Sequence, residues 1–181
     1  MAQANPSKVG EIAPALELPD TDGNVPGLPA PGEAPATVVI WTCNHCPYAL
    51  AWHDRIAAVA RDYAERGVEV LCINSNDASR YPADSPEAMR ARVETERWPM
   101  PYLHDPTQEV ARGYDARTTP DVFVLDGELR LRYRGAPDAD HDQPALQAAW
   151  LRAALDAVLA NEDPDPAETT PVGCSIKWKA G

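Results

Sequence analysis

The chain has 181 residues, of which 44% are hydrophobic and 24% charged, and its formal net charge is −12 at pH 7. This composition is ordinary for one globular domain, and the acidic excess argues against nucleic acid and anionic membrane surfaces as partners. No apolar stretch is long enough to cross a membrane, and residues 1–23 lack the apolar segment of a secretory signal. We therefore expect a cytoplasmic protein.

Residues 1–35 are rich in proline, glycine and acidic side chains, which predicts an irregular N-terminal arm with a small hairpin turning near Asp22-Gly23. Residues 37–41 form an apolar, β-branched run typical of a buried parallel strand. Apolar residues then recur at helical spacing until Gly67 ends the pattern. Residues 68–73 predict a second buried strand.

The later elements continue the alternation of strands and helices. They are a helix from Pro86 to Trp98, a short strand over 101–103, a helix opening at Asp105 or Thr107, a hairpin over 121–135 turning at Asp126-Gly127, and a closing helix over 146–157. This order predicts an α/β domain over 36–160, with a mixed sheet flanked by helices and an antiparallel edge. A solvated linker and C-terminal tail would follow over 161–181.

The chemistry is concentrated in Cys43-Asn44-His45-Cys46-Pro47, where the first strand turns into a helix. The N-terminus of a helix stabilises a thiolate through its free N–H groups and the helix dipole. Two intervening residues bring both sulfurs within disulfide reach. The pattern thus predicts Cys43 as the exposed attacking thiolate and Cys46, inside the first turn, as the resolving thiol.

At this point the sequence resembles the thioredoxin superfamily. The resemblance covers residues 38–150 and depends on "WTCNHCPY", on Thr119-Pro120 before a hairpin strand, and on the order of elements. The segments "VGEIAPALELPDTDG", "INSNDASRYPADSPEAM" and "GCSIKW" are similar to a redoxin subgroup of peroxiredoxin-like proteins.

The resemblance implies roles for residues around the two cysteines. Thr119 and a cis Pro120 would present backbone to a substrate, with Trp41 as a packing wall beside it. His45 stands before the second cysteine, as in oxidising members of the family, and with Asn44 would tune the redox potential. Thr37 replaces a buried aspartate of thioredoxin, so the proton acceptor for Cys46 is not identified.

Other interpretations stand beside this one. A zinc site needs four ligands, and the sequence has neither a second CxxC nor a spaced histidine pair, so we predict no metal. Cys72 lies in a strand and is expected to be a small buried hydrophobe. Cys174, in the tail, either packs or acts as an accessory thiol at the active site.

We therefore expect a thiol–disulfide oxidoreductase that needs no dissociable cofactor, because the cysteines carry the electrons. Its partners would be protein or small-molecule disulfides and a thiol or reductase electron donor. One alternative is a peroxiredoxin-like thiol peroxidase with an antioxidant role, in which Cys43 takes the place of a threonine and Cys46 is the peroxidatic residue. Another is a non-catalytic, redox-sensing binding module.

Overall fold

The structure is a computed structural model that describes residues 8–181. In chain order its elements are β1 (Ala36–Trp41), α1 (Pro47–Ala64), β2 (Glu69–Asn74), the 3₁₀ helix η1 (Pro82–Asp84), α2 (Pro86–Glu96), β3 (Tyr102–His104), α3 (Glu109–Gly113), β4 (Thr118–Thr119), β5 (Asp121–Asp126), β6 (Leu131–Gly135), the 3₁₀ helix η2 (Pro144–Leu146), α4 (Ala149–Leu159) and β7 (Cys174–Ser175). The predicted strands and helices are present in the predicted order. The two-residue strands β4 and β7 and the 3₁₀ helices are additional.

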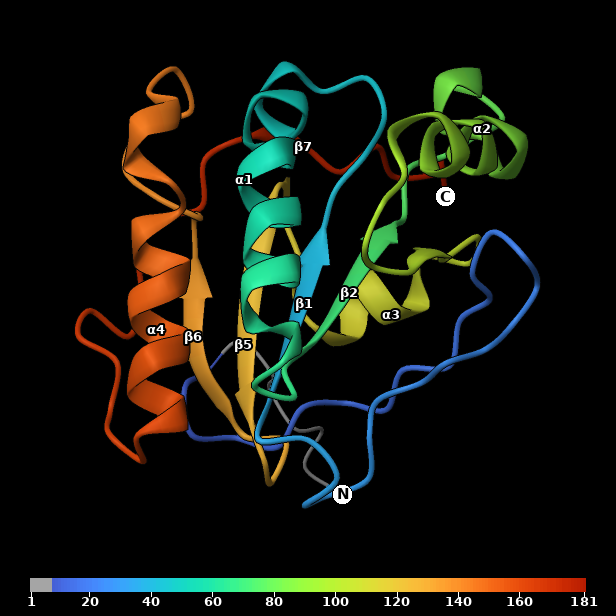
Figure 1. The fold of residues 1–181 in the computed structure, drawn as a ribbon. Coiled ribbons are helices and arrows are strands. Elements are labelled where there is room, and N and C mark those ends of the chain that lie inside the picture. The colour runs from blue at the N-terminus through green and yellow to red at the C-terminus, as the bar shows by residue number, and fades with distance from the viewer. Residues whose placement is uncertain (1–7) are drawn as a thin grey trace.

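Five strands form a central sheet in the order β3-β2-β1-β5-β6. Strands β1, β2 and β3 run parallel, whereas β5 is antiparallel to β1 and β6 is antiparallel to β5. Helices α1 and α4 lie on one face of the sheet and α3 lies on the other (Figure 1). The expected thioredoxin-like fold, with a mixed sheet flanked by helices, is confirmed.

Strand β1 separates two hydrophobic cores. Val38 and Ile40 point into the core beneath α1 and α4, while Val39 and Trp41 point into the core on the α3 side. All six residues of β1 are buried, as expected for a central strand covered on both faces. The loop that follows β1 therefore starts from a rigid point.

Helix α1 begins at Pro47, where the missing N–H of proline is harmless because first-turn N–H groups have no partner within the helix. The sequence predicted that Cys46 lies inside the first turn of this helix. In the structure Cys46 is the N-cap residue and precedes the helix. Cys43 lies in the connection between β1 and α1. Both cysteines thus sit where the end of the strand meets the start of the helix.

The N-terminal arm packs on the sheet and does not form the predicted hairpin. A turn does form, with the N–H of Asp20 donating to the carbonyl of Asn24 (2.7 Å), but no paired strands flank it. Isolated bridges instead join Ile12 to Arg130 and Asp20 to Leu103. Within residues 8–35, backbone groups of Gly10, Glu11, Ala13 and Pro19 are hydrogen-bonded to β3, to β6 and to the turn before β6, in place of pairing within the arm.

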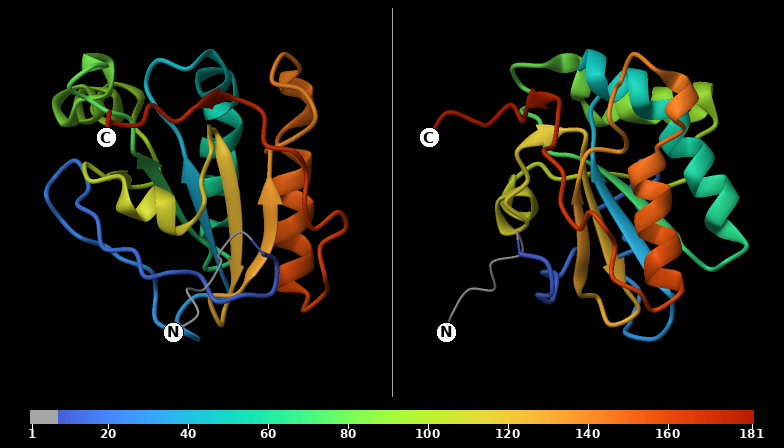
Figure 2. Two further views of the ribbon diagram at one scale, coloured as in Figure 1. Left: turned by 180° about the vertical axis from the view of Figure 1, so that it is seen from behind. Right: turned by 90° about the vertical axis from the view of Figure 1, so that its left-hand side faces the viewer.

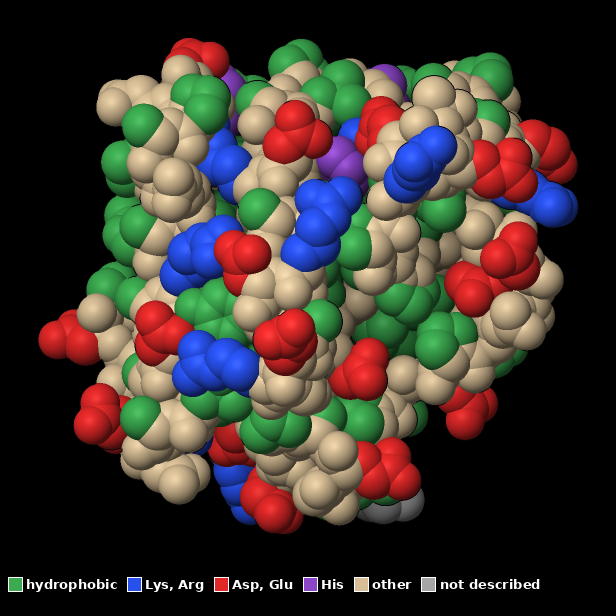
Figure 3. All heavy atoms as spheres, in the orientation of Figure 1, with side chains coloured by type: hydrophobic (Ala, Val, Ile, Leu, Met, Phe, Trp, Pro, Cys, Tyr) green, Lys and Arg blue, Asp and Glu red, His purple; other side chains and the backbone are tan. Residues whose placement is uncertain are grey.

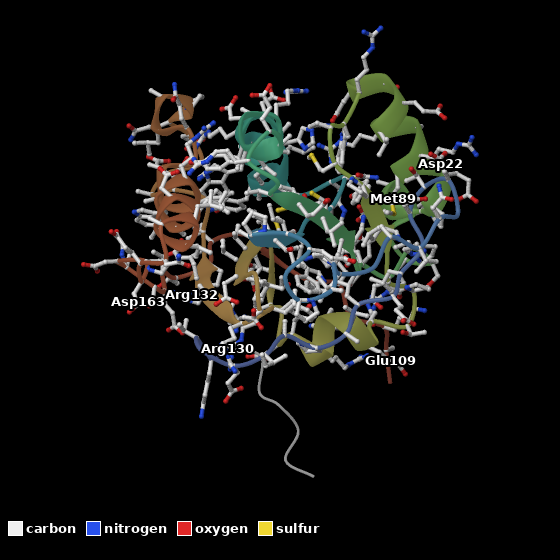
Figure 4. All side chains as sticks on the ribbon, turned by 60° about the horizontal axis from the view of Figure 1, so that its bottom comes forward. Asp22, Met89, Glu109, Arg130, Arg132 and Asp163 are labelled. Carbon is white, nitrogen blue, oxygen red and sulfur yellow. The ribbon has the colours of Figure 1, made fainter. Side chains whose placement is uncertain are left out.

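The segment between α4 and β7 is mostly exposed, as the predicted solvated linker would be, but it is also hydrogen-bonded to β6. The N–H of Arg134 donates to the carbonyl of Ala167 (3.1 Å), and the N–H of Thr169 donates to the carbonyl of Arg134 (2.9 Å). Nearby, Arg132 binds the carboxylate of Asp163 (2.8 Å), and the two residues lie close together beside α4 (Figure 4). The segment covers the edge of β6, whose backbone groups would otherwise lack partners.

After this edge the chain crosses the end of the sheet at which β1 points, and there it forms β7 (Figure 2). Strand β7 pairs antiparallel with β4, so that Thr118 opposes Ser175 and Thr119 opposes Cys174. This crossing brings Cys174 to the same end of the sheet as the CxxC motif. The tail is consequently part of the site.

Charged side chains of both signs lie on the helical face of the molecule. On the face shown in Figure 3, acidic and basic side chains alternate over α1 and α4, and no large patch of one sign is visible. Within residues 8–181, no helix combines the length and apolar character that a membrane crossing requires.

Candidate active site

The two cysteines of the motif are buried. Cys43 and Cys46 each have a relative exposure of 0%, and they form a small apolar cluster with Ala49, against which Cys174 packs. The prediction that Cys43 is exposed is therefore wrong, because the tail and the loop before β5 cover the motif. Cys174 is the cysteine of this group with a partly exposed surface.

Both sulfurs contact Thr119, the residue before a cis peptide bond to Pro120. The hydroxyl of Thr119 lies 3.4 Å from the Cys43 sulfur, and the Cys46 thiol donates to the Thr119 carbonyl oxygen at 3.2 Å. The cis peptide predicted from the resemblance is present, and one residue thus contacts both cysteines of the motif.

Charge is distributed unequally between the two thiols. Hydrogen bonds from the thiol of Cys43, from the thiol of Cys174 and from the backbone N–H of Ala49 lower the pKa of Cys46 to about 4, against the opposing effect of burial. The pKa of Cys43 is raised, by its hydrogen bond to Cys46 and by burial. The sequence placed the depressed pKa on Cys43, whereas these contacts lower the pKa of Cys46, at the helix N-cap, and raise that of Cys43.

A buried carboxylate organises the loop between the cysteines. Asp84 in η1 has 0% exposure, and it accepts hydrogen bonds from the backbone N–H of Asn44 (2.6 Å), the side chain of Asn74 (3.0 Å) and the side chain of Asn76 (3.1 Å). Its second oxygen also binds Nδ1 of His45. These donors replace the water that a buried charge loses.

His45 is therefore held by Asp84 and stacks on Tyr81, with ring centroids 5.3 Å apart. Its side chain keeps a relative exposure of 30%, so the imidazole connects the buried carboxylate to solvent. Its backbone N–H donates to the Cys43 sulfur. His45, the predicted tuning residue, thus contacts Cys43 of the motif, and its effect on the redox potential stays a prediction.

Asn44 fastens the same loop from its other side. Its side-chain carbonyl accepts from the hydroxyl of Tyr102 (2.9 Å) and from Arg92 (3.2 Å), and its amide donates to the carbonyl of Ala83 (2.8 Å). Arg92 also donates to the carbonyl of Cys43 (3.0 Å). The motif is held in place by side chains of η1, α2 and β3.

Trp41, the last residue of β1, is buried. It has 0% exposure, packs against Tyr114 and Phe123 at ring-centroid distances of 5.1 and 5.4 Å, and donates from its indole N–H to Ser75 (3.0 Å). The ring belongs to the core on the α3 side, as a packing wall would, and its predicted part in substrate binding stays a prediction. Trp41 thus anchors the end of β1 in the core on the α3 side of the sheet.

Thr119 and Pro120 are buried as well, because β7 lies on them. A Cβ atom added to Gly173 would come within 2.1 Å of the Thr119 carbonyl oxygen. The tail backbone therefore makes the contact with Thr119 that the sequence assigned to an incoming substrate.

Three potential metal ligands occur together at this site. A sulfur of Cys43, a nitrogen of His45 and an oxygen of Asp84 lie within 4.8 Å of one another. A structural zinc ion takes four protein ligands in tetrahedral geometry, and Asp84 already accepts several hydrogen bonds from the loop. The donor set suits a hydrogen-bonded redox site better than a structural zinc centre.

Cys72 is buried in β2, and burial raises its pKa to about 12. It behaves as the small hydrophobic residue that the sequence predicted.

Asp84, Asn74, Asn76 and Arg92 were not identified from the sequence. The first three lie in or beside the polar segment "NSNDASRYPADSP", which indicates a loop and says nothing about burial. A buried, multiply bonded aspartate in such a segment becomes recognisable only when β2 and η1 are placed next to the CxxC loop.

Comparisons with known proteins identify the family of the chain. Residues 9–134 match the AhpC/TSA family. A comparison with curated proteins found no match.

Two solved structures resemble the whole chain. An uncharacterized conserved protein from Geobacillus kaustophilus is 40% identical with a TM-score of 0.91, covering 98% of this chain and 96% of that one. A hypothetical protein from Sinorhizobium meliloti 1021 is 38% identical with a TM-score of 0.90, and 100% of both chains is covered.

A more distant structure, the peroxidoxin BcpB from Mycobacterium tuberculosis, shares the fold at 18% identity with a TM-score of 0.63, over 85% of this chain and 97% of that one. The family match extends over most of the chain and includes both cysteines, β1 and the cis-proline loop. The chain therefore belongs to the AhpC/TSA family and is a redoxin of the thioredoxin superfamily.

Proposed function

We propose that this protein is a thiol–disulfide oxidoreductase whose Cys43–Cys46 pair cycles between dithiol and disulfide. The observation that carries the proposal is the convergence of both sulfurs, which lie beside the start of α1, on Thr119. The lowered pKa of Cys46 supports it. A thiolate beside a second thiol is the arrangement that exchanges a disulfide and then closes into one.

The roles of the two cysteines follow from their surroundings. Cys46 supplies the thiolate, which is both the better nucleophile at neutral pH and the better leaving group. Cys43 is protonated in the reduced protein and must lose that proton when the disulfide closes. The proposal thereby exchanges the roles that the sequence suggested for the two residues.

The group that takes the proton of Cys43 is the His45–Asp84 pair. Their ligand atoms lie together with the Cys43 sulfur, and His45 reaches solvent. A carboxylate that orients an imidazole toward a reacting group is a common proton-transfer device. It would supply a proton acceptor, a role for which Thr37, in the sequence position of thioredoxin's aspartate, has no suitable group.

A thiol peroxidase with Cys46 as the peroxidatic residue is the second candidate, because Cys46 has the depressed pKa that peroxide attack requires. Two observations favour exchange instead. Among the described residues, no arginine or lysine side chain donates to the Cys46 sulfur. Cys43 is also hydrogen-bonded to Cys46, and a thiol in that place converts a sulfenic acid into a disulfide.

The proposed partners are protein or small-molecule disulfides on one side and a thiol or reductase donor on the other. The proposed compartment is the cytoplasm, where a CxxC pair is more often catalytic than structural. A binding module without catalysis would have no use for a thiolate stabilised at neutral pH, which is why we place it third.

The test compares insulin-disulfide reduction with peroxide consumption in the wild type, Cys43→Ser and Cys46→Ser, with Cys72→Ala as the control for loss of a remote thiol. We expect turnover of disulfides by the wild type and the control, and loss of turnover in both active-site variants. Rapid peroxide consumption that survives in Cys43→Ser and disappears in Cys46→Ser would show a peroxidase instead.

A further inference from the structure

The two cysteines of the proposed redox pair are buried, and the cysteine that solvent can reach is a different one, Cys174. Cys43 and Cys46 have no exposed surface, so a disulfide or thiol in solution cannot touch either sulfur in this conformation. Cys174 is partly exposed, and its thiol is hydrogen-bonded to Cys46. It is the one thiol of this three-cysteine group that faces both the pair and the solvent.

The position of Cys174 is fixed by its neighbours in the tail. It opposes Thr119 in the β4–β7 pair, and Gly173 before it packs on the Thr119 carbonyl at a distance that excludes a side chain. Ile176 after it is 2% exposed and lies in the core on the α3 side. Two contacts thus hold the thiol from both directions along the chain.

The next residue adds a third attachment. The N–H of Lys177 donates to the side chain of Asn76 (2.8 Å), and its carbonyl accepts from the N–H of Asp77 (2.8 Å) and from the side chain of Gln108 (2.9 Å). The side chain of Asn76 also donates a hydrogen bond to Asp84. The tail and the loop of the CxxC motif therefore share one hydrogen-bond network, and Cys174 does not simply fill space.

We propose that Cys174 is a third redox residue, through which thiol–disulfide exchange passes between the solvent and the buried Cys43–Cys46 pair. This inference rests on the proposed function, because it concerns the route to that pair. The partner is a thiol or a dithiol in the reductive direction and a disulfide in the oxidative direction.

The reductive half-reaction balances in three steps. The Cys174 thiolate attacks the Cys46 sulfur of the Cys43–Cys46 disulfide, which forms a Cys46–Cys174 disulfide and releases Cys43 as a thiolate that takes up a proton. A solvent thiolate then attacks the Cys174 sulfur and releases the Cys46 thiolate. A second thiol of the donor attacks the mixed disulfide, which releases Cys174 and leaves the donor oxidised by two electrons.

The acid–base properties of the three sulfurs favour this order. Burial and the hydrogen bond with Cys46 raise the pKa of Cys174 to about 11 while Cys46 is a thiolate. In the Cys43–Cys46 disulfide Cys46 carries no negative charge. The thiol of Cys174 therefore loses its proton more readily and can attack as a thiolate. In the second step Cys46, with the lower pKa, is the better leaving group, so the solvent thiol is directed to the exposed sulfur of Cys174.

The experiment measures the rate at which dithiothreitol reduces the oxidised protein, by stopped-flow fluorescence and by mass spectrometry of quenched samples. Cys174→Ser keeps the volume and a hydrogen-bond donor, and Cys72→Ala removes a thiol from β2 without burying a hydroxyl group there. We expect Cys174→Ser to lower the rate about tenfold or more and to leave the equilibrium potential of the Cys43–Cys46 pair unchanged, while Cys72→Ala behaves as the wild type.

A second variant traps the intermediate. In Cys43→Ser the first disulfide cannot form, so mild oxidation should produce a Cys46–Cys174 disulfide, identified by peptide mapping under non-reducing conditions. If Cys174→Ser is reduced as fast as the wild type and Cys43→Ser yields no such disulfide, the relay is wrong and the exchange function stands. If the oxidised wild type contains no Cys43–Cys46 disulfide, the proposed function and the relay both fail.

Discussion

The imidazole of His45 is bonded to the carboxylate of Asp84, which lies 39 residues later in the chain and is completely buried. The pKa of Cys43 is raised by its bond to Cys46 and by burial, and the charge of Asp84 adds to this effect. His45 is hydrogen-bonded to this carboxylate, so the two side chains act together, as one unit, beside the thiols.

His45→Gln tests the unit. Loss of the imidazole leaves the charge of Asp84 less well compensated next to Cys43, which disfavours the reduced, thiolate-bearing form. We expect the reduction potential of the Cys43–Cys46 couple to fall on the order of 30 mV, equivalent to about 1.4 kcal/mol. Equilibration with glutathione measures it, with His104→Gln as the matched control. Equal potentials in the two variants would show His45 to be a bystander.

Asp84→Asn should destabilise the protein. An asparagine cannot accept from Asn44, Asn74, Asn76 and His45 together, because its NH₂ group would face at least one donor. We expect a loss of about 2 kcal/mol or more in the free energy of unfolding of the reduced protein. Urea denaturation measures it. Asp54→Asn, at an exposed position on α1, should change little, and equal midpoints for the two variants would contradict the role of Asp84.

The titration of the reduced protein should be dominated by Cys46. Its pKa of about 4 lies below the ordinary thiol value of 9.0, so the thiolate absorbance should disappear only as the pH falls through about 4. The stabilisation that the folded thiolate supplies is complete above the unfolded pKa and is lost as the pH falls through the folded one. Far-ultraviolet absorbance measures the transition. If the transition survives in Cys46→Ser and disappears in Cys43→Ser, the thiolate belongs to Cys43 and the assignment to Cys46 is wrong.

Gly173→Ala should loosen the tail. The added methyl group would lie 2.1 Å from the Thr119 carbonyl oxygen, whereas at Gly113 the nearest atom is 3.9 Å away. We therefore expect alkylation of Cys46 by iodoacetamide to become faster in Gly173→Ala and to stay at the wild-type rate in Gly113→Ala. Peptide mass spectrometry of briefly treated samples follows each cysteine separately. Unchanged protection of Cys46 would mean that the tail does not cover it.

The sequence predicted the elements whose patterns are local. The apolar run of β1, the helical spacing of α1 and the Asp126-Gly127 turn between β5 and β6 each follow from side chains within one segment. The CxxC motif and the Thr119-Pro120 pair are likewise short and distinctive. These features sufficed for the fold class and for placing the two cysteines between β1 and α1.

The features that were missed arise from contacts between segments far apart in the chain. Burial of Cys43 results from a two-residue strand pair, Thr118–Thr119 with Cys174–Ser175, which is too short to leave a pattern in the sequence. Asp84 resembles any loop aspartate until Asn74 and the CxxC loop are folded onto it. The lowered pKa of Cys46 depends on the same contacts, since Cys174 is one of the donors to Cys46.

The pairing of β4 with β7 also governs when the site becomes complete. Strands β5 and β6 and helix α4 are all synthesised between Thr119 and Cys174, so a ribosome-bound chain can assemble the five-stranded sheet while Gly173 and Cys174 are not yet available. During that interval the two motif sulfurs would lie uncovered at the end of β1. Long-range pairings of this kind form slowly compared with local ones. The newly made protein would thus pass through a stage in which its thiols meet oxidants directly, before the tail restricts their access.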